Sequence, residues 1–154
     1  MKMKSIIYSV AAASIAMMGF DAMACTNLLA GKNATIDGSV LISYAADSHT
    51  LYGDLQYLPA ADHKPGDMRE IREWDTGKHL GNIPEVAHTY AVVGNINEHQ
   101  VTVAESTFGG RHELADTTKD AIIDYGSLIY LALQRSRTAR EAIKQLVAYG
   151  KYHY

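Results

Sequence analysis

Short apolar stretches separated by turn signals occur twice in the first 107 residues. "TNLLAG" (26–31) and "SVLISYAA" (39–46) flank a polar segment that ends in an Asp-Gly pair, which favours a tight turn. "TYAVVGNI" (89–96) and "QVTVAEST" (100–107) flank the letters "NEH" in the same way. The pattern predicts two β-hairpins. Residues 47–88, between them, are polar and hold the three prolines of the chain, which predicts long loops carrying short strands.

The helical signals lie after the second predicted hairpin. Residues 116–135 are apolar at most positions and predict a helix that is buried on most of its surface. Residues 138–149 predict a second helix, because Thr138 and Glu141 have the spacing of a capping box and Gly150 is a stop signal.

Strands followed by helices predict an α+β fold. The two helices are too apolar to stand in water, so each must cover the face of a sheet. Two hairpins offer little sheet to cover. We therefore expect this chain to hold an incomplete fold.

The chain begins with the pattern of a secretory signal peptide. Two lysines precede an uncharged, mostly apolar run (6–20), and Ala22-Met23-Ala24 places small residues where a signal peptidase reads. The run is shorter than the roughly 20 residues that span a bilayer, and no other stretch of the sequence could cross one. We expect removal of residues 1–24 and export of residues 25–154, as one domain, to the bacterial periplasm or the medium.

Cleavage after Ala24 makes Cys25, the only cysteine, the first residue of the mature chain. Three readings are open. A free cysteine is most often a small buried hydrophobe. A lipidated cysteine would anchor a lipoprotein, although Ala22 stands where that processing favours a Leu-like residue. The third reading is an N-terminal nucleophile.

In an N-terminal nucleophile, one residue supplies both the nucleophile and the base. A thiol with an ordinary pKa of about 8.5 is only slightly ionised at neutral pH and needs a base. A free α-amino group, with a pKa of about 7.7 to 8.0, is substantially unprotonated near neutral pH and can be that base. No histidine is required.

Composition narrows the classes of partner. The net charge is −3, the pI is about 6.1 and no basic block occurs, which argues against nucleic acid. Seven histidines occur without the spacing of a zinc site, and no second cysteine exists, so we expect no metal and no cofactor. Trp74 either lines a substrate pocket or fills a core.

Four blocks of the sequence resemble the PepD-type dipeptidases: "CTNLLAGKNATIDGSVLISYAADSHT", "REWDTGKHLGNIPE", "VVGNINEHQVTVAESTFGGR" and "DYGSLIYLALQRSRTAREAI". That family belongs to the N-terminal-nucleophile (Ntn) cysteine hydrolases, with the bile salt hydrolases and penicillin V acylases. The blocks occur in the family's order from Cys25 to about Tyr149. The resemblance implies a four-layer αββα sandwich, of which this chain would hold the N-terminal part, because family members are several times longer.

The resemblance also implies roles for individual residues. Cys25 matches the nucleophile, and Asp47 matches the aspartate that holds its amino group, although Asp47 alone is also typical of a turn. Thr107 lies where relatives place an oxyanion-stabilising side chain. Asn97 falls in the family's Asn-Glu turn, as a turn residue first and a site residue second. Tyr44 stands where related hydrolases often carry an arginine.

Together these observations predict an exported cysteine hydrolase that cleaves amide bonds, with a dipeptide as its substrate. One alternative is an Ntn amidase that acts on acylated amino acids or bile salt conjugates. Another is an exported domain whose site is catalytically incomplete. The sequence leaves the side-chain preference open and allows an oligomer.

Overall fold

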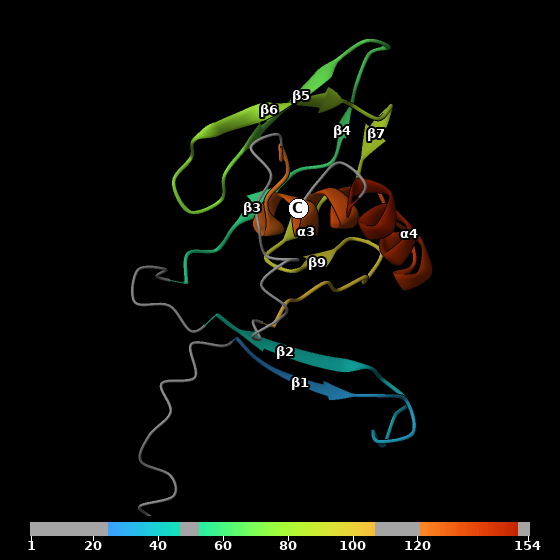
Figure 1. Cartoon of the computed structure of the whole chain (residues 1–154). Coiled ribbons are helices and arrows are strands. Elements are labelled where there is room, and N and C mark those ends of the chain that lie inside the picture. The colour runs from blue at the N-terminus through green and yellow to red at the C-terminus, as the bar shows by residue number, and fades with distance from the viewer. Residues whose placement is uncertain (1–24, 47–52, 107–120, 151–154) are drawn as a thin grey trace, which may run out of the picture.

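The computed structural model describes residues 25–46, 53–106 and 121–150, and these ranges combine helices and strands in an α+β arrangement (Figure 1). The hairpin of β1 (Thr26–Ala30) and β2 (Leu41–Ala45) lies at one end of the molecule, and that of β5 (Met68–Arg72) and β6 (His79–Pro84) lies at the other. The helices α3 (Tyr125–Gln134) and α4 (Ala139–Tyr149) lie between the two hairpins. Stacking of two sheets in an αββα sandwich stays a prediction.

The first predicted hairpin is confirmed. β1 (Thr26–Ala30) and β2 (Leu41–Ala45) pair antiparallel, with Thr26 opposite Ala45 and Ala30 opposite Leu41. The connecting segment contains Gly38 at φ +74°, a left-handed conformation that glycine adopts without strain. The two apolar runs and the Asp-Gly turn signal therefore specify this hairpin locally.

The second predicted hairpin is correct in place and wrong in detail. β8 (Val92–Val93) and β9 (Ile96–Asn97) pair around Gly94 and Asn95, so the tight turn comes earlier than the predicted "NEH". β3 (Tyr57–Leu58) pairs with the other side of β8. Residues 100–106 return as an irregular segment with one bridge, Thr102 opposite Ile96.

The polar segment contains a regular hairpin that the sequence pattern did not predict. β5 (Met68–Arg72) pairs antiparallel with β6 (His79–Pro84), with an irregularity between Ile71 and Arg72. β4 (Ala61–Asp62) and β7 (His88–Thr89) form the short strands that were predicted for this segment. Only Ile71 and Ile83 of the long hairpin are fully buried, so its hydrophobic pattern is weak.

The first predicted helix is shorter than expected. α3 (Tyr125–Gln134) begins after Asp124, whose carboxylate accepts a hydrogen bond from the Ser127 N–H at 3.2 Å. Residues 121–124 are not helical, and residues 116–120 lie outside the described ranges. Eight of the ten residues of α3 are buried.

The second helix, α4 (Ala139–Tyr149), has the predicted caps with small differences. The Thr138 hydroxyl accepts from the Glu141 N–H at 3.2 Å, and the Glu141 carboxylate accepts from the N–H of Arg137, one residue before the expected partner. The helix ends at Gly150, which stays in the right-handed conformation and donates its N–H to Leu146.

The core forms on two sides of α3. One cluster joins the helix to the central strands and α4, and its buried members are Val92, Val101, Ile129, Tyr130, Ala132, Leu133 and Ala142. The other joins it to the β5–β6 hairpin through Ile71, Ile83, Ile123, Leu128 and Leu131. Trp74 packs so closely on Gly126 that a Cβ there would lie 2.6 Å from the Trp74 Cβ.

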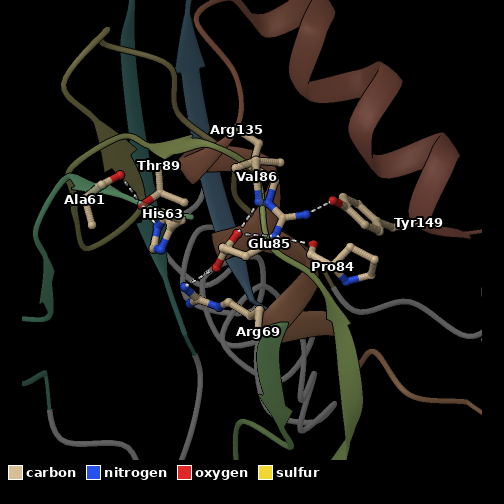
Figure 2. Close-up of polar contacts among 9 residues, drawn as sticks. All are labelled: Ala61, His63, Arg69, Pro84, Glu85, Val86, Thr89, Arg135 and Tyr149. Atoms are coloured by element: carbon tan, nitrogen blue, oxygen red, sulfur yellow. Dashed lines mark hydrogen bonds and ion pairs between the residues drawn. The ribbon is translucent and has the colours of Figure 1, made fainter. Parts of the chain in front are cut away.

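A polar cluster ties both helices to the β5–β6 hairpin (Figure 2). The Glu85 carboxylate, directly after β6, accepts from the Arg135 guanidinium at 2.6 Å and lies 3.6 Å from that of Arg69 on β5. Arg135 follows α3 and also donates to the hydroxyl of Tyr149 at the end of α4. The Glu85 and Arg135 side chains are each 4% exposed, so this ion pair is withdrawn from water.

The expected uncovered apolar surface is found on α4 but not on α3. Ile143 and Val147 of α4 are 60% and 62% exposed, whereas the unpredicted β5–β6 hairpin covers α3. The β1–β2 hairpin also leaves large apolar side chains exposed, among them Leu28, Leu29 and Leu41. No helix within the described ranges is both long and apolar enough to cross a membrane.

Candidate active site

The predicted nucleophile lies where β1 begins. Cys25 is a free, half-buried cysteine, and its Sγ donates to the Glu105 Oε1 atom at 2.8 Å. Glu105 belongs to the irregular segment that follows β9, so the contact joins two distant parts of the sequence. The thiol therefore has a carboxylate as its hydrogen-bond partner. The hypothesis that Cys25 is only a small buried hydrophobe does not account for this contact.

Tyr44 completes a three-residue cluster with Cys25 and Glu105. It lies on β2 opposite Asn27, and its hydroxyl is 3.2 Å from Glu105 Oε1 and 3.7 Å from Cys25 Sγ. Burial, followed by the proximity of the Cys25 and Glu105 groups, raises the pKa of Tyr44 well above its ordinary range. The phenol therefore keeps its proton and donates to the carboxylate or to the sulfur.

Two further hydrogen bonds hold the Glu105 segment against β1. The Asn27 amide donates to the Glu105 backbone carbonyl at 2.7 Å. The Ser106 hydroxyl donates to the Cys25 backbone carbonyl at 3.2 Å. These bonds fix the backbone of Glu105 and Ser106 next to β1, which places the Glu105 carboxylate at the Cys25 thiol.

An aromatic cavity of about 350 Å³ adjoins this cluster. Tyr44 belongs to both, because its ring lines the cavity and its hydroxyl reaches Cys25. The lining also includes Tyr125 and the pair of Trp74 and Tyr130, whose rings stack with centroids 4.7 Å apart. Trp74 therefore packs against the core and also lines this cavity, whose use as a substrate pocket stays a prediction.

The cavity is acidic as well as aromatic. Asp54 lines it, and the Tyr125 hydroxyl donates to the Asp75 carboxylate at 3.0 Å. Burial raises the pKa of Tyr125 to about 12, with further contributions from Asp75, Glu105 and Asp124. None of the described lining residues is Lys, Arg or His. A cation would be favoured here over an anion.

Asn97 has a structural position away from this cluster. Its side chain is buried, donates to the carbonyls of Leu133 at 2.8 Å and Ser136 at 2.7 Å, and accepts from the N–H groups of His99 and Val101. Both amide hydrogens are therefore used in joining the turn after β9 to the end of α3. A catalytic role for Asn97 stays a prediction.

The other two predicted site residues, Asp47 and Thr107, lie outside the described residues. Sequence reasoning did not identify Glu105, and it noted Tyr44 only as a replacement for an arginine. A signal for Glu105 existed, because it is the one charged residue in the run 100–107. Across the described ranges, His, Cys, Asp and Glu side chains form no group of three that could hold a metal ion.

Comparison with protein families shows which family of enzymes the chain belongs to. The model of Peptidase family C69 matches residues 24–69 and 54–153, which together cover most of the chain. The chain belongs to Peptidase family C69. This confirms the resemblance to the PepD-type dipeptidases and indicates a cysteine-type peptidase. No curated protein and no solved structure matches the chain.

Proposed function

We propose that this C69 peptidase is an exported cysteine dipeptidase in which Cys25, freed at its amino group by removal of residues 1–24, is the nucleophile. The observation that carries the proposal is the position of Cys25 immediately before β1, with its Sγ 3.7 Å from the hydroxyl of Tyr44, a residue that lines the aromatic cavity. Family membership supports peptide-bond hydrolysis by a cysteine. The proposed domain comprises residues 25–154 and is part of an Ntn sandwich.

The proposed reaction proceeds through a thioester. The Cys25 α-amine takes the thiol proton, and the sulfur attacks the scissile carbonyl to form a tetrahedral oxyanion. The resulting ammonium gives its proton to the leaving amine as the C–N bond breaks, which leaves an acyl thioester on Sγ. The amine then removes a proton from water, which attacks the thioester and releases the amino acid and the thiol.

The remaining roles follow from the family pattern. Asp47 would orient the α-amine, and Thr107 with backbone N–H groups would stabilise the oxyanion. Asn97 would contribute by fixing the turn after β9. Tyr44 is suited to stabilise the developing thiolate, because its neutral hydroxyl lies 3.7 Å from Sγ.

A substitution at Cys25 tests this proposal. Cys25→Ser should lower kcat/KM for dipeptides by at least about 100-fold, since the serine hydroxyl is a much weaker nucleophile at neutral pH. Iodoacetamide should inactivate the parent protein and label Cys25, and a chelator should leave activity unchanged. Inhibition by the chelator together with an active Cys25→Ala variant would contradict the proposal.

The amidase alternative has its own readout. Faster hydrolysis of penicillin V or glycocholate than of dipeptides by the parent protein would favour it. The acidic character of the cavity favours the dipeptide, because a free dipeptide carries an ammonium group next to its scissile bond whereas those substrates do not.

A further inference from the structure

The carboxylate that touches the nucleophile is poorly suited to remove its proton. Ordinary pKa values of about 4.3 for glutamate and 8.5 for cysteine make a carboxylate a far weaker base than a thiolate. Glu105, held 2.8 Å from Sγ, is instead suited to bind a positively charged group that enters the site.

A peptide with a free amino terminus brings that charge to the right place. When Sγ bonds to the carbonyl carbon of the N-terminal residue, the α-ammonium nitrogen is three bonds from the sulfur. Such a nitrogen is within hydrogen-bond reach of an acceptor that already contacts Sγ. We infer that Glu105 binds the α-ammonium group of the substrate and thereby selects peptides with a free N-terminus; this inference rests on the proposed function.

Glu105 is positioned before substrate arrives. Tyr44 donates to its carboxylate at 3.2 Å and Asn27 donates to its backbone at 2.7 Å, which limits the freedom of the side chain. The contacts from Cys25 and Tyr44 both end on Oε1, which among the described residues leaves Oε2 as the atom that would accept from the ammonium group. A preorganised carboxylate loses little entropy on binding, which increases affinity.

The surroundings fit the rest of the same residue. The cavity next to Tyr44 is walled by Trp74, Tyr125 and Tyr130, which suits an aromatic or large aliphatic side chain at the N-terminal position. Asp54 and Asp75 add negative charge near this wall. A substrate without the ammonium group would leave Glu105 half-buried beside an uncharged ligand, which costs binding free energy.

Binding of two matched ligands tests the inference without turnover. The ligands are Phe-Ala and 3-phenylpropanoyl-Ala, which is the same molecule without its amino group. In the full chain carrying Cys25→Ser, calorimetry should show that Phe-Ala binds at least about 100-fold more tightly, because a site built for a polar group rejects the analogue that lacks it. Adding Glu105→Gln should reduce the ratio below about tenfold by weakening Phe-Ala alone.

Two further variants make the result specific. Glu105→Asp keeps the carboxylate and should retain part of the preference. Glu70→Gln, at an exposed position on β5, should leave the ratio unchanged. Thermal unfolding of each variant shows that it is folded, and the comparison of the two ligands in Cys25→Ser alone does not depend on any change at Glu105.

Two results would overturn the inference. One is equal binding of the two ligands with Glu105 present. The other is an equal loss of affinity for both ligands in Glu105→Gln, which would place the action of Glu105 on Cys25 and not on the substrate. Hydrolysis of Phe-Ala by the parent protein is measured separately: hydrolysis without ligand discrimination rejects only the inference, and discrimination without hydrolysis rejects only the proposed function.

Discussion

The Cys25 thiol donates a hydrogen bond to the carboxylate of Glu105, which lies 80 residues further along the chain, with Sγ and Oε1 2.8 Å apart. This contact brings the start of β1 to the segment after β9. Tyr44, on the strand that pairs with β1, reaches both groups. The candidate site is therefore assembled from three separate segments, and each of them can be tested by substitution.

Removal of the Tyr44 hydroxyl should lower the reactivity of the Cys25 thiol. Tyr44→Phe loses a donor 3.7 Å from Sγ, and a hydrogen bond to a charged group contributes about 1.5 to 3 kcal/mol. We expect about a tenfold fall in kcat/KM for Phe-Ala and a similar fall in the rate at which iodoacetamide labels Cys25. Tyr57→Phe, at an exposed position on β3, is the control and should change neither rate. Unchanged labelling in Tyr44→Phe would exclude this role.

Substitution of Asn97 should reduce stability more than chemistry. Asn97→Ala leaves two carbonyl groups and two N–H groups without their side-chain partner, and one unsatisfied buried group costs about 1 to 3 kcal/mol. Urea unfolding should show a loss of at least about 3 kcal/mol, whereas Asn82→Ala, at an exposed position of β6, should be near neutral. A large loss of kcat in a stable, folded Asn97→Ala protein would instead support the predicted catalytic role.

The buried ion pair of Glu85 and Arg135 should make stability depend on acid pH. Burial alone would raise the pKa of Glu85, but the Val86 N–H and the Arg135 and Arg69 guanidinium groups together lower it. Because the folded pKa lies below the unfolded value of about 4.3, the stabilisation is present above that value and is lost as the pH falls through the folded pKa. Urea unfolding between pH 7 and pH 3 measures this loss.

The variant Glu85→Gln separates the acid dependence that comes from the Glu85–Arg135 pair from that of the other carboxylates. Glu85→Gln leaves Arg135 buried without its counter-ion and should lower the free energy of unfolding at pH 7 by about 3 kcal/mol. Its stability should then fall less steeply with acid than that of the parent protein. Glu70→Gln breaks only an exposed pair with Arg72 and should cost less than about 1 kcal/mol. Parallel pH profiles for Glu85→Gln and the parent would contradict the assignment.

Features with local signals could be predicted from the sequence. The first hairpin follows from two apolar runs and an Asp-Gly turn, and the start of α4 follows from Thr138 and Glu141. Cys25 was selected as the candidate nucleophile from its position after Ala24 and from the family pattern, and that role stays a prediction. In each case the residues that decide the structure lie within a few positions of one another.

Features that depend on distant partners could not be predicted in this way. The β5–β6 hairpin is mostly polar. Its two isoleucines are buried by packing on α3, which lies far away in the sequence. The tight turn at Gly94 precedes the predicted one, and a second turn follows it at the predicted "NEH", where the Asn97 side chain accepts from the N–H groups of His99 and Val101. Glu105 is the one charged residue in its run (100–107), but its closeness to Cys25 depends on the fold and was not predicted.

Mass spectrometry of an acid-quenched reaction identifies the nucleophile itself. The p-nitrophenyl ester of phenylalanine has a good leaving group, so acylation should outrun deacylation and the acyl-enzyme should accumulate. Digestion of the quenched protein should then yield a first peptide that begins at Cys25 and carries one phenylalanyl group on Sγ. A first peptide that begins before Cys25, or an unmodified Cys25 in a sample that is hydrolysing the ester, would contradict an N-terminal cysteine nucleophile.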